Sequence, residues 1–131
     1  MPQTPATLYE GFLPGQHVIE AYGAGGFRFA DMSHRGSILA LPEGVRAWAP
    51  VAPAEITPAS LADLFAGDPG TVELLMIGMG AAPFPLPEAT RMALRENNIR
   101  FDFMATGSAV STYNILLGER RRVAGAFLAT L

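Results

Sequence analysis

The segment Thr71–Gly80, with the sequence TVELLMIGMG, constrains the fold more than any other part of the chain. It is a short apolar run that ends in a Gly-x-Gly turn, and a proline-spaced segment and a helical pattern follow it. Such a run is typical of a strand that is buried in an α/β sheet. The segment therefore predicts a central strand on which a single small sheet is built.

The chain before this strand predicts mainly β-structure. Residues 1–14 carry three prolines and little periodicity, so we expect a flexible N-terminal arm there and a single folded domain over residues 15–131. Short apolar segments separated by glycine-containing turns then predict a β-meander. Its expected strands are His17–Tyr22, Phe27–Ala30, Ser37–Leu41 and Val45–Trp48.

The remaining chain predicts helices and strands in alternation. Apolar residues recur at helical spacing in three places, and a capping residue or a proline stands at each start. The expected helices are Thr57–Gly67, a second from Pro87 to Asn97 or Asn98, and a third from Thr106 or Ser108 to Leu117. Two further strands are expected at Ile99–Met104 and Val123–Ala129.

The order of these elements predicts a three-layer α/β fold with a mixed central sheet. A strand, a helix and a strand in succession form a right-handed βαβ crossover, so the strand at Ile99–Met104 should lie parallel to the central one. The connection between the last helix and the last strand is short. We therefore expect the last strand to run antiparallel to its neighbours.

Composition argues against several functional classes. The net charge of −3 disfavours nucleic acid as a partner, because binding a polyanion requires a basic face. The absence of cysteine excludes disulfides, thiolate nucleophiles and cysteine metal ligands. Neither a secretory signal nor a membrane-spanning apolar run is present, so we expect a cytoplasmic protein.

Two loops leave the C-terminal ends of adjacent predicted strands, at Gly78–Pro85 and Ala105–Ser108. Ligands bind at this edge of open α/β sheets because helix N-termini with free N–H groups converge there. The alternative is that the glycines only permit a tight turn and close packing, and that the hydroxyls are ordinary helix caps. The candidate pocket residues are Gly78, Met79, Gly80, Thr106, Gly107, Ser108, Tyr113 and Asn114.

No catalytic set accompanies this candidate pocket. Pro83 stands where the dinucleotide-binding fingerprint requires its third glycine, which argues against a nucleotide site. The two histidines, His17 and His34, fall in the predicted meander, so no base is assigned to the pocket hydroxyls. No metal-ligand spacing is visible either. We therefore expect no catalytic residues, no metal and no cofactor.

Arg120, Arg121 and Arg122 form a short basic cluster on a weakly acidic chain. Such a cluster is usually solvated or neutralises a helix C-terminus. Its functional alternative is a docking point for an acidic partner or an anionic lipid surface. We take these three arginines as a candidate interaction patch. If the protein contacts the inner membrane, we expect a peripheral contact and no membrane-spanning segment.

Several segments in combination resemble a known family. They are GSILALP at residues 36–42, IGMG at residues 77–80, TGSAVSTYNILL at residues 106–117 and, after an arginine-rich turn, VAGA at residues 123–126. The family consists of small domains of uncharacterised function. It includes a mitochondrial assembly factor of respiratory complex I, the third assembly factor of the NADH dehydrogenase alpha subcomplex, and many bacterial proteins. The resemblance covers about residues 12–131.

The resemblance implies a three-layer α/β fold, no established catalytic activity and, for the mitochondrial relative, a role in building a membrane-bound complex. Family members often carry threonine where this chain has Met79 and cysteine where it has Val110, so both differences remove polar groups from the candidate pocket. We expect a non-enzymatic assembly or interaction factor whose partners belong to a membrane-bound respiratory or insertion complex. The alternative is a small-ligand or anion-binding protein, or an enzyme, that uses the strand-end loops.

Overall fold

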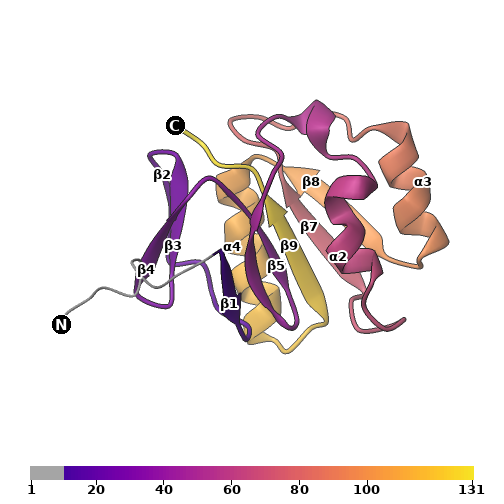
Figure 1. Ribbon diagram of the computed structural model, residues 1–131, viewed down its shortest axis with the longest axis horizontal. Coiled ribbons are helices and arrows are strands. Elements are labelled where there is room, and N and C mark those ends of the chain that lie inside the picture. The colour runs from indigo at the N-terminus through magenta and orange to yellow at the C-terminus, as the bar shows by residue number, and fades with distance from the viewer. Residues whose placement is uncertain (1–10) are drawn as a thin grey trace.

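The computed structural model describes residues 11–131 and contains a six-stranded main sheet (Figure 1). Its strands are β1 (Phe12–Pro14), β5 (Ser37–Leu41), β6 (Gly44–Trp48), β7 (Leu74–Gly78), β8 (Arg100–Met104) and β9 (Val123–Phe127). They lie side by side in the order β1-β6-β5-β9-β7-β8. The strand predicted within Thr71–Gly80 is β7, which is an interior strand because β9 and β8 flank it.

A second, three-stranded antiparallel sheet consists of β2 (Ala21–Gly23), β3 (Gly26–Phe29) and β4 (Met32–Arg35), and is called the small sheet below. The predicted hairpins β2–β3 and β5–β6 are confirmed, but they belong to different sheets. The turn between β2 and β3 holds three consecutive residues at positive φ, and two of them are glycines that adopt this conformation without strain. Strand β4 was not predicted.

The expected flexible arm over residues 1–14 falls partly outside the structure. Residues 1–10 lie outside the described residues. The remainder includes β1, whose residues pair antiparallel with β6, Phe12 opposite Arg46 and Pro14 opposite Gly44. Strand β1 therefore forms one edge of the main sheet.

Three α-helices accompany the sheets: α2 (Ala62–Phe65), α3 (Glu88–Glu96) and α4 (Thr106–Gly118). The helix predicted over Thr57–Gly67 is shorter than expected, because a 3-10 turn at Ala59–Leu61 precedes α2. The second and third predicted helices are confirmed as α3 and α4. The N-cap of α4 is Ala105, so the predicted hydroxyl caps are wrong.

The direction of the last strand differs from the prediction. Strand β8 lies parallel to β7, as expected. Strand β9 is antiparallel to β5 but parallel to β7, so the expectation that it opposes both neighbours is wrong. The reason is that α4 itself carries the chain back along the sheet, and its thirteen residues span about 20 Å. The short connection after α4 then starts β9 at the same end as β7 and β8.

Two apolar clusters on opposite faces of the main sheet confirm the three-layer arrangement. One cluster joins alternate residues of β5, β7 and β9 to α2 and α3, with Leu75, Ile77 and Leu94 fully buried. The other joins the opposite face of the same strands to α4 and the small sheet. In Figure 1, α2 and α3 accordingly lie away from α4 and the small sheet. The carboxyl ends of β7 and β8 and the start of α4 thus meet at one edge of the sheet.

Candidate functional site

The two predicted strand-end loops meet at Thr106, which is completely buried. Its hydroxyl donates a hydrogen bond to the carbonyl of Leu128 at 2.7 Å and accepts one from the backbone N–H of Gly80 at 2.9 Å. Its own N–H donates to the carbonyl of Gly80 at 2.9 Å. Because the hydroxyl joins the ends of β7 and β9 to the start of α4, it is not free to cap the helix.

Close packing explains two glycines of the candidate pocket. A Cβ atom at Gly78 would lie 2.9 Å from the Cα atom of Thr106, and one at Gly107 would overlap the hydroxyl oxygen of Tyr22. Real Cβ atoms do not approach other atoms this closely. The half-exposed Tyr22 ring therefore lies over the first turn of α4, in space that only glycine leaves open.

Tyr113 faces the interior of the protein. It is 1% exposed and packs edge-on against Phe127, with 5.4 Å between the ring centroids. Burial raises the pKa of its phenol to about 12, so the hydroxyl is protonated at neutral pH. Of the other predicted pocket residues, Met79 is buried and Ser108 is exposed.

Asn114 holds a segment of the chain that was predicted to be a strand. Its side-chain oxygen accepts from the N–H of Ile19 at 2.9 Å, and its side-chain nitrogen donates to the carbonyl of Ile19 at 2.9 Å. The amide thus supplies the hydrogen bonds that a neighbouring strand would have supplied to Ile19. This contact explains why only Ala21 and Tyr22 of the expected strand His17–Tyr22 are in β2.

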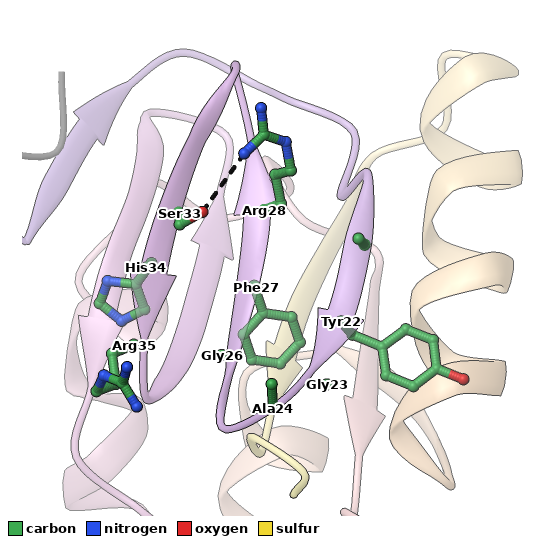
Figure 2. Close-up of a pocket in the computed structure, with 10 residues that line it drawn as sticks. Tyr22, Gly23, Ala24, Gly26, Phe27, Arg28, Ser33, His34 and Arg35 are labelled. Atoms are coloured by element: carbon green, nitrogen blue, oxygen red, sulfur yellow. Dashed lines mark hydrogen bonds between the residues drawn. The ribbon is translucent and has the colours of Figure 1, made fainter. Parts of the chain in front are cut away.

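A hollow of about 410 Å³ lies over the small sheet and is called the outer hollow below (Figure 2). All three strands of the small sheet contribute to it, and its charged and hydroxyl-bearing residues include Arg28, Ser33 and Arg35. Arg28 forms an ion pair with Glu20 at 3.6 Å and hydrogen bonds to the Ser33 hydroxyl at 3.5 Å. In Figure 2, Arg28 and Arg35 lie toward opposite ends of the hollow.

His34 also borders the outer hollow. Its Nε2 lies 3.2 Å from the carbonyl of Ser37, and burial lowers the pKa of the imidazole below its ordinary value. The ring is therefore neutral at neutral pH, with Nε2 as the donor to that carbonyl. The other histidine, His17, precedes the small sheet, and its Nε2 lies 2.9 Å from the carbonyl of Pro14.

A second hollow, of about 210 Å³, lies between residues 64–72 and residues 96–99. Its lining residues include Asp68 and Glu96. Within residues 11–131, however, no group of three or more histidine, aspartate or glutamate side chains is arranged to hold a metal ion.

Two of the three arginines of the predicted interaction patch, Arg121 and Arg122, lie around Glu73. The Glu73 carboxylate lies 3.1 Å from Nε of Arg121, 3.7 Å from Arg122 and 3.9 Å from Arg100. The hydrogen bond from Arg121 is the main reason that the pKa of Glu73 lies below its ordinary value. The name arginine cluster is used below for Arg100, Arg120, Arg121 and Arg122, all of which are exposed. Three guanidinium groups around the one carboxylate of Glu73, with Arg120 next to them in the chain, leave an excess of positive charge.

Sequence reasoning found only part of these surfaces. It identified the arginine triplet, but it missed Arg100 and Glu73, because they come from β8 and the segment before β7. It also missed the outer hollow. The hairpin prediction contained a usable signal, since alternation along a strand assigns Arg28 to the face opposite Phe27 and Phe29.

The described part of the chain includes no helix that is long and apolar enough to cross a membrane.

Comparison with known proteins gives consistent matches over most of the chain. The family described as "Protein of unknown function (DUF498/DUF598)" matches residues 19–128. An uncharacterized protein of Rhodobacter capsulatus is 36% identical over 122 residues, which cover 92% of this chain and 87% of that protein.

Solved structures extend this comparison to the fold. A crystal structure described as an outer membrane protein from Bartonella henselae is 43% identical, with a TM-score of 0.85 over 90% of this chain and 98% of that one. The solution structure of a Bordetella pertussis protein, described as a Mth938-like domain, is 27% identical. Its TM-score is 0.74, and the match covers 98% of this chain and 91% of that one.

Proposed function

The chain belongs to the DUF498/DUF598 family of proteins of unknown function, and we propose that it is a non-enzymatic interaction protein that binds an acidic segment of a protein partner. The proposed docking site is the arginine cluster. The observation that carries this proposal is the convergence of exposed guanidinium groups from two distant parts of the chain on the single carboxylate of Glu73.

The charge balance of the cluster supports an acidic partner. Glu73 neutralises only one of the neighbouring positive charges, while the whole chain carries a net charge of −3. Guanidinium groups bind carboxylates with two parallel hydrogen bonds, which favours aspartate and glutamate side chains as occupants. A local basic surface on an acidic protein also directs the approach of an acidic partner.

The backbone beneath the cluster is held in place. Arg122 donates a hydrogen bond to the carbonyl of Gly70, and the N–H groups of Glu73 and Leu74 donate to the carbonyl of Arg122. These contacts fix the segment between α4 and β9 against the segment before β7. A partner would therefore meet a backbone that is already ordered, which lowers the entropic cost of binding.

The resemblance described from the sequence extends the proposal to the kind of partner. The mitochondrial relative in that family is an assembly factor of respiratory complex I, so a subunit of a membrane-bound respiratory or insertion complex is the first partner to test. In this proposal the protein acts in the cytoplasm and meets the membrane only through that complex.

The competing ligand site at the strand-end loops has less support. The Thr106 hydroxyl is committed to Gly80 and Leu128, and Tyr22 covers Gly107. Thr106 and Gly107 therefore serve the fold, which leaves fewer of the expected groups for a ligand.

The direct test measures binding of a fluorescently labelled glutamate-rich peptide by anisotropy. Arg120→Gln should weaken binding by about two- to fivefold, because one exposed ion pair contributes about 0.5–1 kcal/mol. Arg95→Gln, which removes one exposed positive charge from α3, is the matched control and should bind like the parent chain. Glu73→Gln should bind more tightly because it removes the competing carboxylate. Raising the salt concentration should reduce these differences.

The partner itself is sought in the host by photo-cross-linking, because the chain has no lysine for amine-reactive reagents. A photo-reactive phenylalanine analogue in place of Glu119 would lie beside Arg120. Cross-links to respiratory-complex subunits that disappear with Arg120→Gln would support the proposal. If Arg120→Gln, Arg95→Gln and the parent chain bind the peptide equally well, the arginine cluster is not the docking site.

A further inference from the structure

The outer hollow is a surface that the proposed function does not use. Pairing along the small sheet places Arg28 opposite Ser33, and Gly26 opposite both Gly23 and Arg35. Residues that pair across antiparallel strands share a face. The face opposite the buried Phe27 therefore carries both arginines and the serine hydroxyl.

Glycine forms the floor of the outer hollow. Gly26 has no side chain to fill the space between Arg35 and Gly23, which pair with it from either side. A Cβ atom at Gly26 would overlap the carbonyl oxygen of His34, so no larger residue fits between the strands there. Strands β3 and β4 thus lie so close together that only glycine fits at position 26, and the missing side chain leaves the hollow open there.

The turn between β2 and β3 lies beside the hollow, and both backbone groups of its Gly25, the N–H and the carbonyl, form hydrogen bonds. The N–H of Gly25 donates to the carbonyl of Thr130 at 2.6 Å, and the N–H of Gly36 donates to the carbonyl of Gly25 at 2.7 Å. The turn is therefore fixed by the C-terminal segment and by the residue after β4. A site on an anchored turn loses little conformational freedom when it binds a ligand.

The two arginines at the hollow, Arg28 and Arg35, differ in whether their guanidinium groups are already paired. Arg28 is already paired with Glu20 and bonded to Ser33. Within residues 11–131, the side chain of Arg35 forms no ion pair or hydrogen bond, and its Nη1 lies 3.8 Å from where a Cβ of Gly25 would be. The guanidinium of Arg35 thus lies beside the anchored turn, and no hydrogen bond within residues 11–131 uses its donors.

We propose that the outer hollow binds a small organic anion, whose carboxylate or phosphate group pairs with the guanidinium of Arg35. The apolar part of the anion lies over Gly26 and against Ala21 and Ala24, which also border the hollow. A volume of about 410 Å³ suits a small organic molecule better than a bare inorganic ion. Arg28 and Ser33 supply further donors toward the other end of the hollow (Figure 2).

The test is a titration of ¹⁵N-labelled protein with phenyl phosphate, benzoate and inorganic phosphate, followed by NMR. Saturable shifts at the amides of Gly23, Gly25 and Gly26 are expected with at least one of the two organic anions. The one that binds more tightly identifies phosphate or carboxylate as the preferred group. Arg35→Gln should weaken this binding by about tenfold or more, because it removes a charged donor from the oxyanion.

Two further variants test whether binding depends on Arg35 and on the shape of the hollow. Arg95→Gln on α3 removes an exposed positive charge elsewhere and should leave the affinity unchanged. Ala21→Phe keeps every charge but fills the hollow from the exposed strand β2, and should also abolish binding. The proposal is overturned if neither organic anion gives saturable shifts, if Arg35→Gln binds as tightly as the parent chain, or if inorganic phosphate binds equally well. Since the arginine cluster is unchanged in all these variants, this outcome is independent of acidic-peptide binding.

Discussion

At the scale of single residues, several polar side chains in this protein hold the fold together at points where backbone pairing ends. Thr106 is the clearest case, because one hydroxyl satisfies a donor on the β7 side and an acceptor after β9. Thr90 acts similarly from α3, donating its hydroxyl to the carbonyl of Ile56 at 2.6 Å. Both residues are completely buried, so these hydroxyls satisfy groups that water cannot reach.

Tyr113 makes stability depend on pH in the alkaline range. Its pKa in the folded protein is about 12, above the value of about 10 in an unfolded chain. The contribution of the neutral phenol is therefore complete below about pH 10 and is lost as the pH rises toward about 12. We expect the free energy of unfolding to fall by about 2–3 kcal/mol over that range.

Urea unfolding of the parent chain and of Tyr113→Phe at about pH 9 and about pH 12 measures this effect. The variant lacks the phenol that ionises, so its stability should fall less. Equal losses in the two proteins would mean that Tyr113 ionises as easily in the folded state as in the unfolded state.

At the scale of elements, α4 packs against the main sheet and also positions the segment before β2. The helix carries no charged residue, and its buried side includes Ala109, Val110 and Tyr113. Asn114 extends its influence to the segment before β2, where Ile19 is only 2% exposed. A helix side chain thus replaces a neighbouring strand for this segment.

Removing that side chain should loosen the segment before β2. Asn114→Ala leaves the N–H and the carbonyl of Ile19 without their partner, so we expect the free energy of unfolding to fall by about 1–3 kcal/mol. Hydrogen exchange at the Ile19 amide should also become faster than in the parent chain. Asn114→Asp keeps the acceptor for the Ile19 N–H but places a second carboxylate oxygen against the Ile19 carbonyl, so its exchange should be intermediate. Unchanged exchange in Asn114→Ala would show that other packing holds the segment.

At the scale of the whole molecule, the main sheet ends in β1 on one side and β8 on the other. An exposed edge strand can pair with another chain. On β8, the carboxylate of Asp102 accepts a hydrogen bond from the N–H of Phe103 at 2.9 Å. The side chain therefore occupies a donor that a second strand would need, and places a negative charge at the edge.

We expect Asp102→Ala to increase self-association through β8. Light scattering during size-exclusion chromatography over a range of protein concentrations would detect the larger species. Asp102→Asn is the control that separates the two effects, because its amide oxygen still accepts from Phe103 while the charge is lost. If Asp102→Ala and the parent chain have the same mass at every concentration, Asp102 does not protect the edge.

The sequence by itself determined the elements whose signals are local. The apolar run of β7, the periodic patterns of α3 and α4, and the glycine turn between β2 and β3 each depend on residues close together in the chain. The parallel pairing of β7 and β8 followed as well, because the intervening helix forces the chain to return before β8 begins. The arginine triplet was visible for the same reason.

Only the tertiary structure decided which distant groups meet. It separated the small sheet from the main sheet, set β9 parallel to β7, and used Thr106 and Asn114 as structural contacts. It also brought Glu73 among the arginines and shaped the outer hollow. These outcomes depend on hydrogen bonds and ion pairs between residues up to 95 positions apart, as for Ile19 and Asn114. Local sequence patterns record which conformation a segment favours, whereas such long-range partners are chosen by the packing of the whole chain.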